Sequence, residues 1–339
     1  MKKIKIAVTG AGGGVGQSII KGLYDTEYTI VGLDADILAT GLYGVPIAYK
    51  TLSVEDPGYI ENILEICKKE DCKLLFPGLD SELALLSEHS ERFKEIGTTV
   101  VVSSLEAVEV ADNKLLTYKL LSSHKIPVAR TFALSDFLSS EGALNFPVII
   151  KPMVGGSRSK DVYFLQTKKD LDWIISKPNF DKGNFVIQEY IEGEEYTCGT
   201  ISLDQKCWGV IVMRRILRNG DTYKCFTVKN KKIEEVVMKV INTLKPFGAC
   251  NVQLRLKAGV LPIVFEINAR CSGTTGPRAL AGFNEPKMIA DYLLFNKKPV
   301  FKIKEVSMLR YWKEVVVKNH DVGIVNSKKK IINKRYPKL

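Results

Sequence analysis

The sequence is poor in the residues that most metal sites and nucleophilic sites use. Only three histidines occur among 339 residues, at positions 89, 124 and 320. The seven cysteines are scattered and form no Cys-x-x-Cys pair. The sequence therefore gives little support to a zinc ribbon, a disulfide framework, a histidine metal site or a Ser/His/Asp triad.

Long apolar runs are also missing. No segment approaches the roughly 18 apolar residues that a membrane-spanning helix needs. The basic start resembles a signal peptide only superficially, because Lys5 and the following glycines interrupt any apolar core and no small-residue cleavage site follows. With 45% apolar and 26% charged residues, we expect a soluble cytoplasmic protein of two or three domains.

The net charge of +11 is concentrated at one end of the chain. Residues 296–339 hold 13 Lys+Arg against 3 Asp+Glu, whereas the other 295 residues hold 36 against 35. We favour a solvated basic tail. The alternative is a tail that binds an acidic partner or an anionic surface such as lipid or RNA.

The first third has the pattern of a Rossmann-like domain. An apolar strand, "KIKIAVTG", leads into a glycine-rich turn and a helix, and a second strand ends at Asp34 and Asp36. Such a turn brings backbone N–H groups close to an anion at the helix N-terminus. However, Val15 stands where the dinucleotide fingerprint needs its last glycine. Nicotinamide binding is therefore kept as an alternative.

Two acidic residues follow a further strand, "CKLLFPGLD". Parallel sheets bind ligands at the carboxyl ends of their strands, so Asp80 and Glu82 are candidate substrate contacts. Capping of the following helix is the alternative explanation for both.

The middle of the chain contains two segments suited to a nucleotide. Lys151 ends an apolar strand and precedes a loop with Gly155, Gly156 and Ser157, which suits a polyphosphate, since the lysine supplies charge and the loop supplies backbone donors. In "QEYIEGEE", the backbone of Glu189, Tyr190 and Ile191 could hold an adenine, and Glu195 a ribose. The alternatives are an ordinary hairpin with a surface lysine and an exposed acidic turn.

The last third carries the most informative pattern. "ACNVQLRLKAGVLPIVFEINAR" predicts a hairpin around "KAGVL". Alternation places Glu266, Asn268 and Arg270 on one face and Phe265, Ile267 and Ala269 on the other. A loop of two or four residues adds Gln253 to the polar face, and a four-residue loop sets it opposite Glu266. Gln253, Glu266 and Asn268 would then offer hard oxygen ligands for Mg²⁺, and Arg270 could stabilise a transferring phosphoryl group.

In this order the motifs resemble the ATP-grasp superfamily, and in particular one ATP-grasp half of the carbamoyl phosphate synthase large subunit. The resemblance covers residues 1 to about 300 and rests on Lys114, Lys151 with its glycine loop, "QEYIEGEE", Gln253 and "FEINARCSG". It implies that Lys114 contacts ATP. It also places "CSGTTGPRALAGFNEP" near the second substrate, so that Ser272, Thr274 and Arg278 are candidate substrate contacts.

The resemblance further implies an α/β ATP-grasp fold, with two α+β subdomains that clamp ATP after the Rossmann-like domain. The expected divisions are 1–108, 109–300 (with a lid-bearing part 109–190 and a metal and acceptor part 191–300) and a basic segment 301–339. The implied reaction uses ATP and Mg²⁺ or Mn²⁺ to convert a small carboxylate into an acyl phosphate, which an amine then attacks. A homodimer is also expected. Since only one ATP-grasp unit is present, carbamoyl phosphate is not the expected product.

Two other functions stay open at this point. One is a nicotinamide-dependent oxidoreductase or epimerase that uses the N-terminal glycines, although it leaves the face of Gln253, Glu266 and Asn268 unexplained. The other is an ATP-binding module without turnover.

Overall fold

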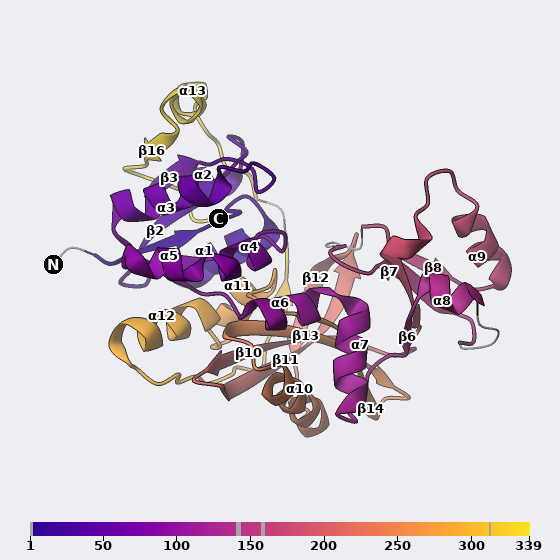
Figure 1. Ribbon diagram of the computed structural model, residues 1–339. Coiled ribbons are helices and arrows are strands. Elements are labelled where there is room, and N and C mark those ends of the chain that lie inside the picture. Colours follow the sequence, from indigo (N-terminus) through magenta and orange to yellow (C-terminus); the bar gives the residue numbers. More distant parts are fainter. Residues whose placement is uncertain (1–2, 140–143, 157–159, 312) are drawn as a thin grey trace.

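The computed structural model describes residues 3–139, 144–156, 160–311 and 313–339, and its described strands form three sheets. Figure 1 shows the sheet of the N-terminal part above a large sheet, while a small third sheet projects to one side. This arrangement confirms the predicted α/β fold class, in which a parallel domain precedes two α+β parts.

The N-terminal sheet has the strand order β16-β3-β2-β1-β4-β5, and β1 to β5 run parallel. α1 packs on one face through Ile19 and Ile20, and α3 on the other through Ile63 and Cys67. Coverage of both faces explains why the strand sequences are continuously apolar. The strands are β1 (Lys5–Val8), β2 (Thr29–Asp34), β3 (Ile47–Lys50), β4 (Cys72–Phe76) and β5 (Thr99–Val100). The helices are α1 (Gly14–Leu23), α2 (Thr40–Tyr43), α3 (Tyr59–Glu70), α4 (Leu83–Glu88) and α5 (Ser90–Glu95).

Two helices connect this domain to the small sheet. They are α6 (Leu105–Asp112) and α7 (Lys114–Ser123). The side chain of Asn113 caps the second helix by accepting from the backbone N–H groups of Leu115 and Leu116. The neighbouring Asp112 accepts from the N–H of Gly155, 3.0 Å away.

The small sheet is antiparallel, with the order β6-β9-β7-β8. A cluster of Leu134, Val148, Ile150 and Leu171 forms its own core. Its strands and helices are β6 (Thr131–Ala133), α8 (Leu134–Ser139), β7 (Val148–Pro152), β8 (Tyr163–Leu165), α9 (Lys168–Ile175) and β9 (Phe185–Glu189), with a 3₁₀ turn, η2, at Lys182–Asn184.

The large sheet is antiparallel, with the order β14-β13-β10-β11-β12-β15. α10 packs against it through an apolar stripe that includes Ile233, Val237 and Ile241. Its strands are β10 (Glu195–Leu203), β11 (Lys206–Arg218), β12 (Asp221–Thr227), β13 (Gly248–Lys257), β14 (Leu261–Asn268) and β15 (Ser307–Leu309). The associated helices are α10 (Lys231–Leu244), α11 (Thr275–Leu280) and α12 (Glu285–Phe295).

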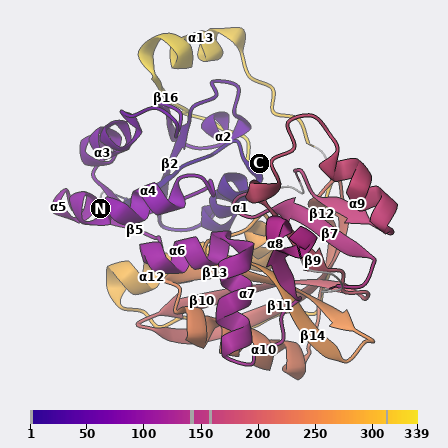
Figure 2. The same cartoon turned by 45° about the vertical axis from the view of Figure 1, so that its right-hand side comes forward.

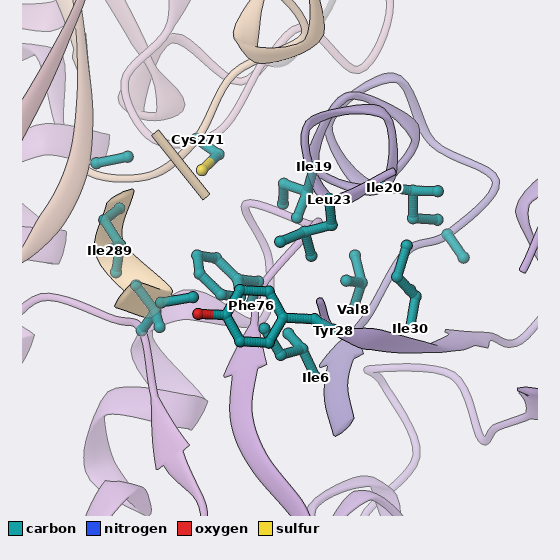
Figure 3. Packing of buried hydrophobic residues seen from close by; sticks show 14 of the residues in the cluster. Ile6, Val8, Ile19, Ile20, Leu23, Tyr28, Ile30, Phe76, Cys271 and Ile289 are labelled. Carbon is teal, nitrogen blue, oxygen red and sulfur yellow. The ribbon is translucent and has the colours of Figure 1, made fainter. Parts of the chain in front are cut away.

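The N-terminal domain and the large sheet share one apolar core. Ile6 and Phe76 of the parallel strands belong to the same buried cluster as Ile19 of α1. Cys271 and Ile289, from the last third of the chain, complete it, as Figure 3 shows. These two parts are therefore held in a fixed relation, whereas the small sheet has a separate core.

Most residues of the basic tail are exposed, as the favoured interpretation of its composition expects, but the tail also packs on the rest of the molecule. Its first strand, β15, extends the large sheet, and α13 (Asn319–Lys328) and β16 (Lys330–Ile332) pack against the N-terminal domain. Figures 1 and 2 show α13 and β16 of this yellow segment beside the N-terminal domain, and Figure 1 shows β16 next to β3. Val325 and Ile331 are buried there, and Lys330 and Lys338 pair with acidic residues. Part of the positive charge of the tail is therefore paired with acidic residues of the N-terminal domain.

Glu70 anchors this tail. Its carboxylate accepts from Lys5 Nζ at 2.5 Å and Lys330 Nζ at 2.7 Å, and from the Tyr49 hydroxyl. Burial disfavours the charged form, but these donors outweigh it and hold the pKa of Glu70 at about 2, below its ordinary 4.5. A carboxyl with a lowered pKa contributes stability above its unfolded pKa, and that contribution is lost as the pH falls toward the folded value.

We therefore expect Glu70→Gln to lower the unfolding temperature at pH 7. The difference from wild type should shrink between pH 4.5 and pH 2, as measured by calorimetry. Glu65→Gln, on the exposed side of the same helix, is the control and should change little. A difference that does not depend on pH would contradict this role of Glu70.

Candidate active site

A large cleft lies between the three sheets, and we call it the central cleft. Its volume is about 1250 Å³. It is lined by the N-terminal glycine turn, the segment after β4, the lysine and glycine loop of the small sheet and one face of the large sheet. Most predicted site residues meet here: Asp80, Lys114, Lys151, Gly155, Gly156, Glu189, Tyr190, Ile191, Glu195, Gln253, Glu266, Asn268, Arg270, Ser272 and Thr274. Ser157 lies outside the described residues.

The β13–β14 hairpin presents the polar residues to the cleft in a way that the sequence did not predict. Its loop has three residues, 258–260, because the strands close with Lys257 opposite Leu261. A β-bulge between Gln253 and Leu254 then restores the pairing of Gln253 with Glu266. The expected pair is present, but an odd loop and a bulge produce it rather than a four-residue loop.

The bulge also changes the direction of Phe265. The sequence placed Phe265 with Ile267 and Ala269, yet it lines the central cleft and packs near Ile191. Ile267 and Ala269 lie in the core of the large sheet, as predicted. The extra residue thus lets Phe265 and Glu266 face the cleft together.

Glu266 is the centre of the candidate metal site. Its Oε1 accepts from Gln253 Nε2 and from Asn268 Nδ2, both at 3.0 Å. One carboxylate and two side-chain amides are a hard-oxygen set that suits a Mg²⁺ ion bound mainly by water and substrate phosphates. In the described residues no group of three or more His, Cys, Asp or Glu side chains could enclose a metal. The two amides turn their nitrogens toward Glu266, while Gln253 Oε1 accepts from Arg215 and Asn268 Oδ1 accepts from Arg270, so an ion would have to displace these donors to reach the amide oxygens.

Two lysines approach the same part of the cleft. Lys151 Nζ donates to the carbonyl oxygen of Phe265 at 3.0 Å, and Lys114 Nζ donates to the carbonyl of Gly155. Both lysines are buried. Burial lowers the pKa of Lys151 to about 8, with Glu266 opposing the shift and Lys114 adding to it. A bound polyphosphate would favour the charged form of Lys151.

Nucleotide binding should consequently take up a proton. With a pKa of about 8 in the free protein, Lys151 is largely neutral at pH 9 and charged at pH 6.5. We expect calorimetric titration with Mg–ADP in buffers of different ionisation enthalpy to show uptake at pH 9 and little at pH 6.5. Lys151→Arg, which stays charged, should bind without this uptake, while Lys119→Met on the exposed side of α7 should behave as wild type. Equal uptake in Lys151→Arg would assign the proton to another group.

Glu195, predicted to hold a ribose, is tightly engaged by two arginines. Arg215 Nη2 lies 2.6 Å from its Oε1, and Arg255 Nη2 lies 2.8 Å from its Oε2. Burial disfavours the carboxylate, but the two cations outweigh it and lower the pKa of Glu195. Arg255 also donates to the carbonyl of Ile191, at 3.1 Å. The acidic segment is therefore fixed in place before any ligand binds.

Arg270 is held by Asp80 through two hydrogen bonds, from Nε at 2.6 Å and from Nη2 at 2.7 Å. Its Nη2 also donates to Asn268 Oδ1 at 3.2 Å. Asp80 lines the cleft as expected, but its carboxylate orients Arg270 instead of standing free for a substrate. Burial opposes the charge of Asp80, and Arg270 nevertheless lowers its pKa.

Two predicted substrate contacts are wrong because their side chains are buried away from the cleft. Glu82 accepts from Thr9 Oγ1 at 2.6 Å and from two backbone N–H groups after β4, so it holds that turn. Burial raises its pKa in spite of these donors. Arg278 is fully buried, 2.8 Å from Glu285, and also donates to Thr197 and Asn251. A charged residue in a substrate-binding segment can equally be a core residue when a partner is buried with it.

The N-terminal glycine turn is partly explained by close packing. A Cβ on Gly16 would lie 2.1 Å from the carbonyl oxygen of Gly10, so only glycine fits there. Asp34 already accepts from the N–H of Gly12 at 2.7 Å. The acidic residue that would bind the adenosine ribose of a nicotinamide dinucleotide is thus used to hold the turn. Gly13, Gly14 and Val15 nevertheless line the central cleft.

Sequence reasoning missed three arginines of the cleft. Arg255 follows Gln253 by two residues on the same strand, so alternation could have placed it on the polar face. Arg215 lies in "MRRILR", where alternation alone does not single it out. Arg310 follows the short strand β15, which has no clear signal in the sequence.

Comparison with known proteins agrees with this geometry. Residues 6–101 match the family model of the PylC-like N-terminal domain, and residues 181–315 match that of ATP-grasp in the biosynthetic pathway with Ter operon. The second match makes the chain similar to ATP-grasp proteins over residues 181–315. The first match corresponds to the parallel sheet, and the second match to the large sheet.

Individual relatives are distant. The carbamoyl phosphate synthase large chain of Thermotoga maritima is 21% identical over 282 residues, which cover 74% of this chain and 25% of the relative. The D-alanine–D-alanine ligase of Francisella tularensis subsp. novicida is 23% identical over 187 residues, 55% of each chain. The match thus spans about a quarter of the length of the first relative.

A solved structure supports the fold over nearly the whole chain. The N5-carboxyaminoimidazole synthetase of Staphylococcus aureus, complexed with ADP, has a TM-score of 0.72 at 16% identity and covers 91% of this chain and 82% of its own. The predicted ATP-grasp fold is therefore confirmed. Within the described residues, no helix combines the length and the apolar character needed to cross a membrane.

Proposed function

We propose that this protein is an ADP-forming ligase that activates a carboxylate as an acyl phosphate for attack by an amine. The observation that carries the proposal is the convergence of Lys151, Glu266 and Arg270 on one cleft. ATP-grasp relatives named as ligases and synthases support it, as does the ADP complex of the structural neighbour. The cytoplasmic location and the homodimer stay predictions.

In this proposal the chain acts by positioning and charge neutralisation. Lys114, Lys151 and the N–H group of Gly156 hold the phosphates, while the segment 189–191 holds the adenine. Gln253, Glu266 and Asn268 would hold Mg²⁺ or Mn²⁺, which supplies charge neutralisation on the phosphates. Arg270, oriented by Asp80, faces the phosphoryl group as it leaves ADP.

Two bond exchanges make up the proposed reaction. A carboxylate oxygen attacks the γ-phosphorus, and the bond to the ADP oxygen breaks. The amine nitrogen then attacks the carbonyl carbon, inorganic phosphate leaves and the nitrogen loses a proton. Neither exchange requires a covalent bond to the protein, so the side chains of the cleft need only bind and orient the reactants.

The experiment is a screen of small carboxylic acids with ATP, Mg²⁺ and hydroxylamine. An acyl phosphate is expected to give a hydroxamate together with stoichiometric ADP, and omission of the acid should abolish both. Nucleotide binding without acid-dependent ADP release for any acid would favour the module without turnover. Binding of a nicotinamide dinucleotide instead of ATP would favour the oxidoreductase.

A further inference from the structure

The central cleft continues past Arg270 into a corner that the proposed nucleotide site does not use. This distal corner is formed by Ser272–Thr274, by Gly13–Val15 at the start of α1 and by Arg310 after β15. Ser18 Oγ donates to the carbonyl oxygen of Gly273 at 2.8 Å. Arg310 donates to the same oxygen and, at 3.0 Å, to the carbonyl of Thr222. Three parts of the chain that are distant in sequence thus meet at Gly273.

Arg310 differs from the other cleft arginines in its charge balance. Arg215, Arg255 and Arg270 each form an ion pair with a carboxylate. Among the described residues, no carboxylate lies within 4.0 Å of the Arg310 guanidinium, which donates to backbone carbonyls. A largely desolvated cation without a counterion is unfavourable, and an anion would relieve this cost.

Other charges near Arg310 also affect how unfavourable its unpaired positive charge is. Burial lowers the pKa of Arg310, and the carboxylate of Asp221 on β12 partly offsets this effect. Lys21 of α1 has a pKa lowered by burial and by the positive charges of Arg310 and Lys313. Arg310 and Lys21 thus act on one another as like charges, and Asp221, which also lines the cleft, forms no ion pair with Arg310 among the described residues.

The turn at Ser272–Thr274 supplies further donors. The two hydroxyl oxygens lie 2.7 Å apart, so one proton joins them, and Ser272 Oγ also accepts from the backbone N–H of Thr274 at 3.2 Å. The second hydroxyl proton has no acceptor among the described residues and can be donated into the cleft. Both side chains are buried and line the cleft.

The corner lies beyond the phosphate contacts along the chain. Lys151 contacts Phe265, the metal residues end at Asn268, and Gly273 follows five residues later. Five residues span at most about 17 Å. A small molecule that reacts beside Arg270 can therefore extend a second group to Arg310.

We propose that the distal corner binds an anionic group, a carboxylate or a phosphate monoester, that one co-substrate carries in addition to its reacting group. The reaction in which this co-substrate takes part rests on the proposed function. The binding of an anion in the distal corner does not depend on it. Such a site would favour acids or amines that carry a further negative charge. Arg310 and the donors of Ser272–Thr274 would bind that charge.

The test is thermal unfolding in saturating Mg–ADP, with inorganic phosphate or succinate as the probe and chloride at equal ionic strength as the reference. Wild type should be stabilised by one of the two probes, which distinguishes the phosphate from the carboxylate. Arg310→Met should need at least tenfold more of that anion, while Arg310→Lys should retain part of the effect. The control is Arg92→Met, at an exposed ion pair outside the cleft, and should match wild type.

The anion-dependent increment is the readout, because loss of the two carbonyl contacts could lower the baseline unfolding temperature by itself. An equal increment in wild type and Arg310→Met, or none in wild type with either anion, would overturn the proposal. If the anion increment depends on Arg310 but Mg–ADP does not stabilise wild type, the proposed function fails and the anion site stands. If Mg–ADP stabilises both and the anion acts on neither, only the anion site fails.

Discussion

Glu266→Gln should reduce turnover by a factor on the order of 10²–10³ or more, the typical cost of removing a well-placed charged group from an active site. Glu266 is the only carboxylate of the candidate metal face, and it also accepts hydrogen bonds from Gln253 and Asn268. A neutral amide of the same shape removes the charge but keeps the packing. The effect should therefore appear in kcat and in the dependence on Mg²⁺ rather than in stability.

Acid-dependent ADP release at several Mg²⁺ concentrations measures this effect. Glu61→Gln, at an exposed ion pair with Arg92, is the matched control and should keep normal turnover. A folded Glu266→Gln protein with turnover within about threefold of wild type would remove Glu266 from the metal site.

Arg270→Met should lose turnover by about 10²–10³ as well, because the guanidinium is expected to stabilise the transferring phosphoryl group. This change has a second consequence. Asp80 is paired with Arg270 at 2.6 Å and is only partly buried, so leaving its charge unpaired should cost less than the roughly 3–5 kcal/mol typical of a fully buried pair. Lost activity alone would thus not separate chemistry from folding.

The double variant Asp80→Asn/Arg270→Met separates the two effects. It should regain much of the lost stability, since no unpaired charge remains, but it should stay inactive. Urea unfolding and ADP release measure the two quantities. A double variant that regains turnover along with stability would show that Arg270 acts only on the fold, and the phosphoryl role would have to be withdrawn.

The sequence was sufficient for the parallel N-terminal domain and for the polar face of β14. The N-terminal strands are continuously apolar, and Glu266, Asn268 and Arg270 alternate along β14. Both patterns depend only on neighbouring residues, so they can be recognised without knowing the rest of the fold. The pairing of Gln253 with Glu266 was also expected, although a bulge and an odd loop produce it. A bulge depends on how the strand fits its neighbours, so the period alone does not reveal it.

The failures have a common origin in contacts between distant parts of the chain. Arg278 and Glu82 were predicted as substrate contacts, but each finds buried partners in other elements. The tail is mostly exposed, yet Ile331 and Lys330 meet β3 and Glu70. The composition of a segment describes that segment alone. The places of these residues depend on unpaired groups elsewhere in the fold, such as the open edge of β3.

The most direct test of the central claim is thermal unfolding of wild type and Glu266→Gln with Mg–ATP, with ATP plus chelator and with NAD⁺. A ligand at about 100 times its Kd stabilises a protein by about 2.7 kcal/mol. We predict a metal-dependent ATP shift in wild type that is strongly reduced in Glu266→Gln, and no shift with NAD⁺. A shift with NAD⁺ alone, or an ATP shift that is the same in Glu266→Gln and independent of metal, would contradict the placement of the nucleotide and metal on the β13–β14 face.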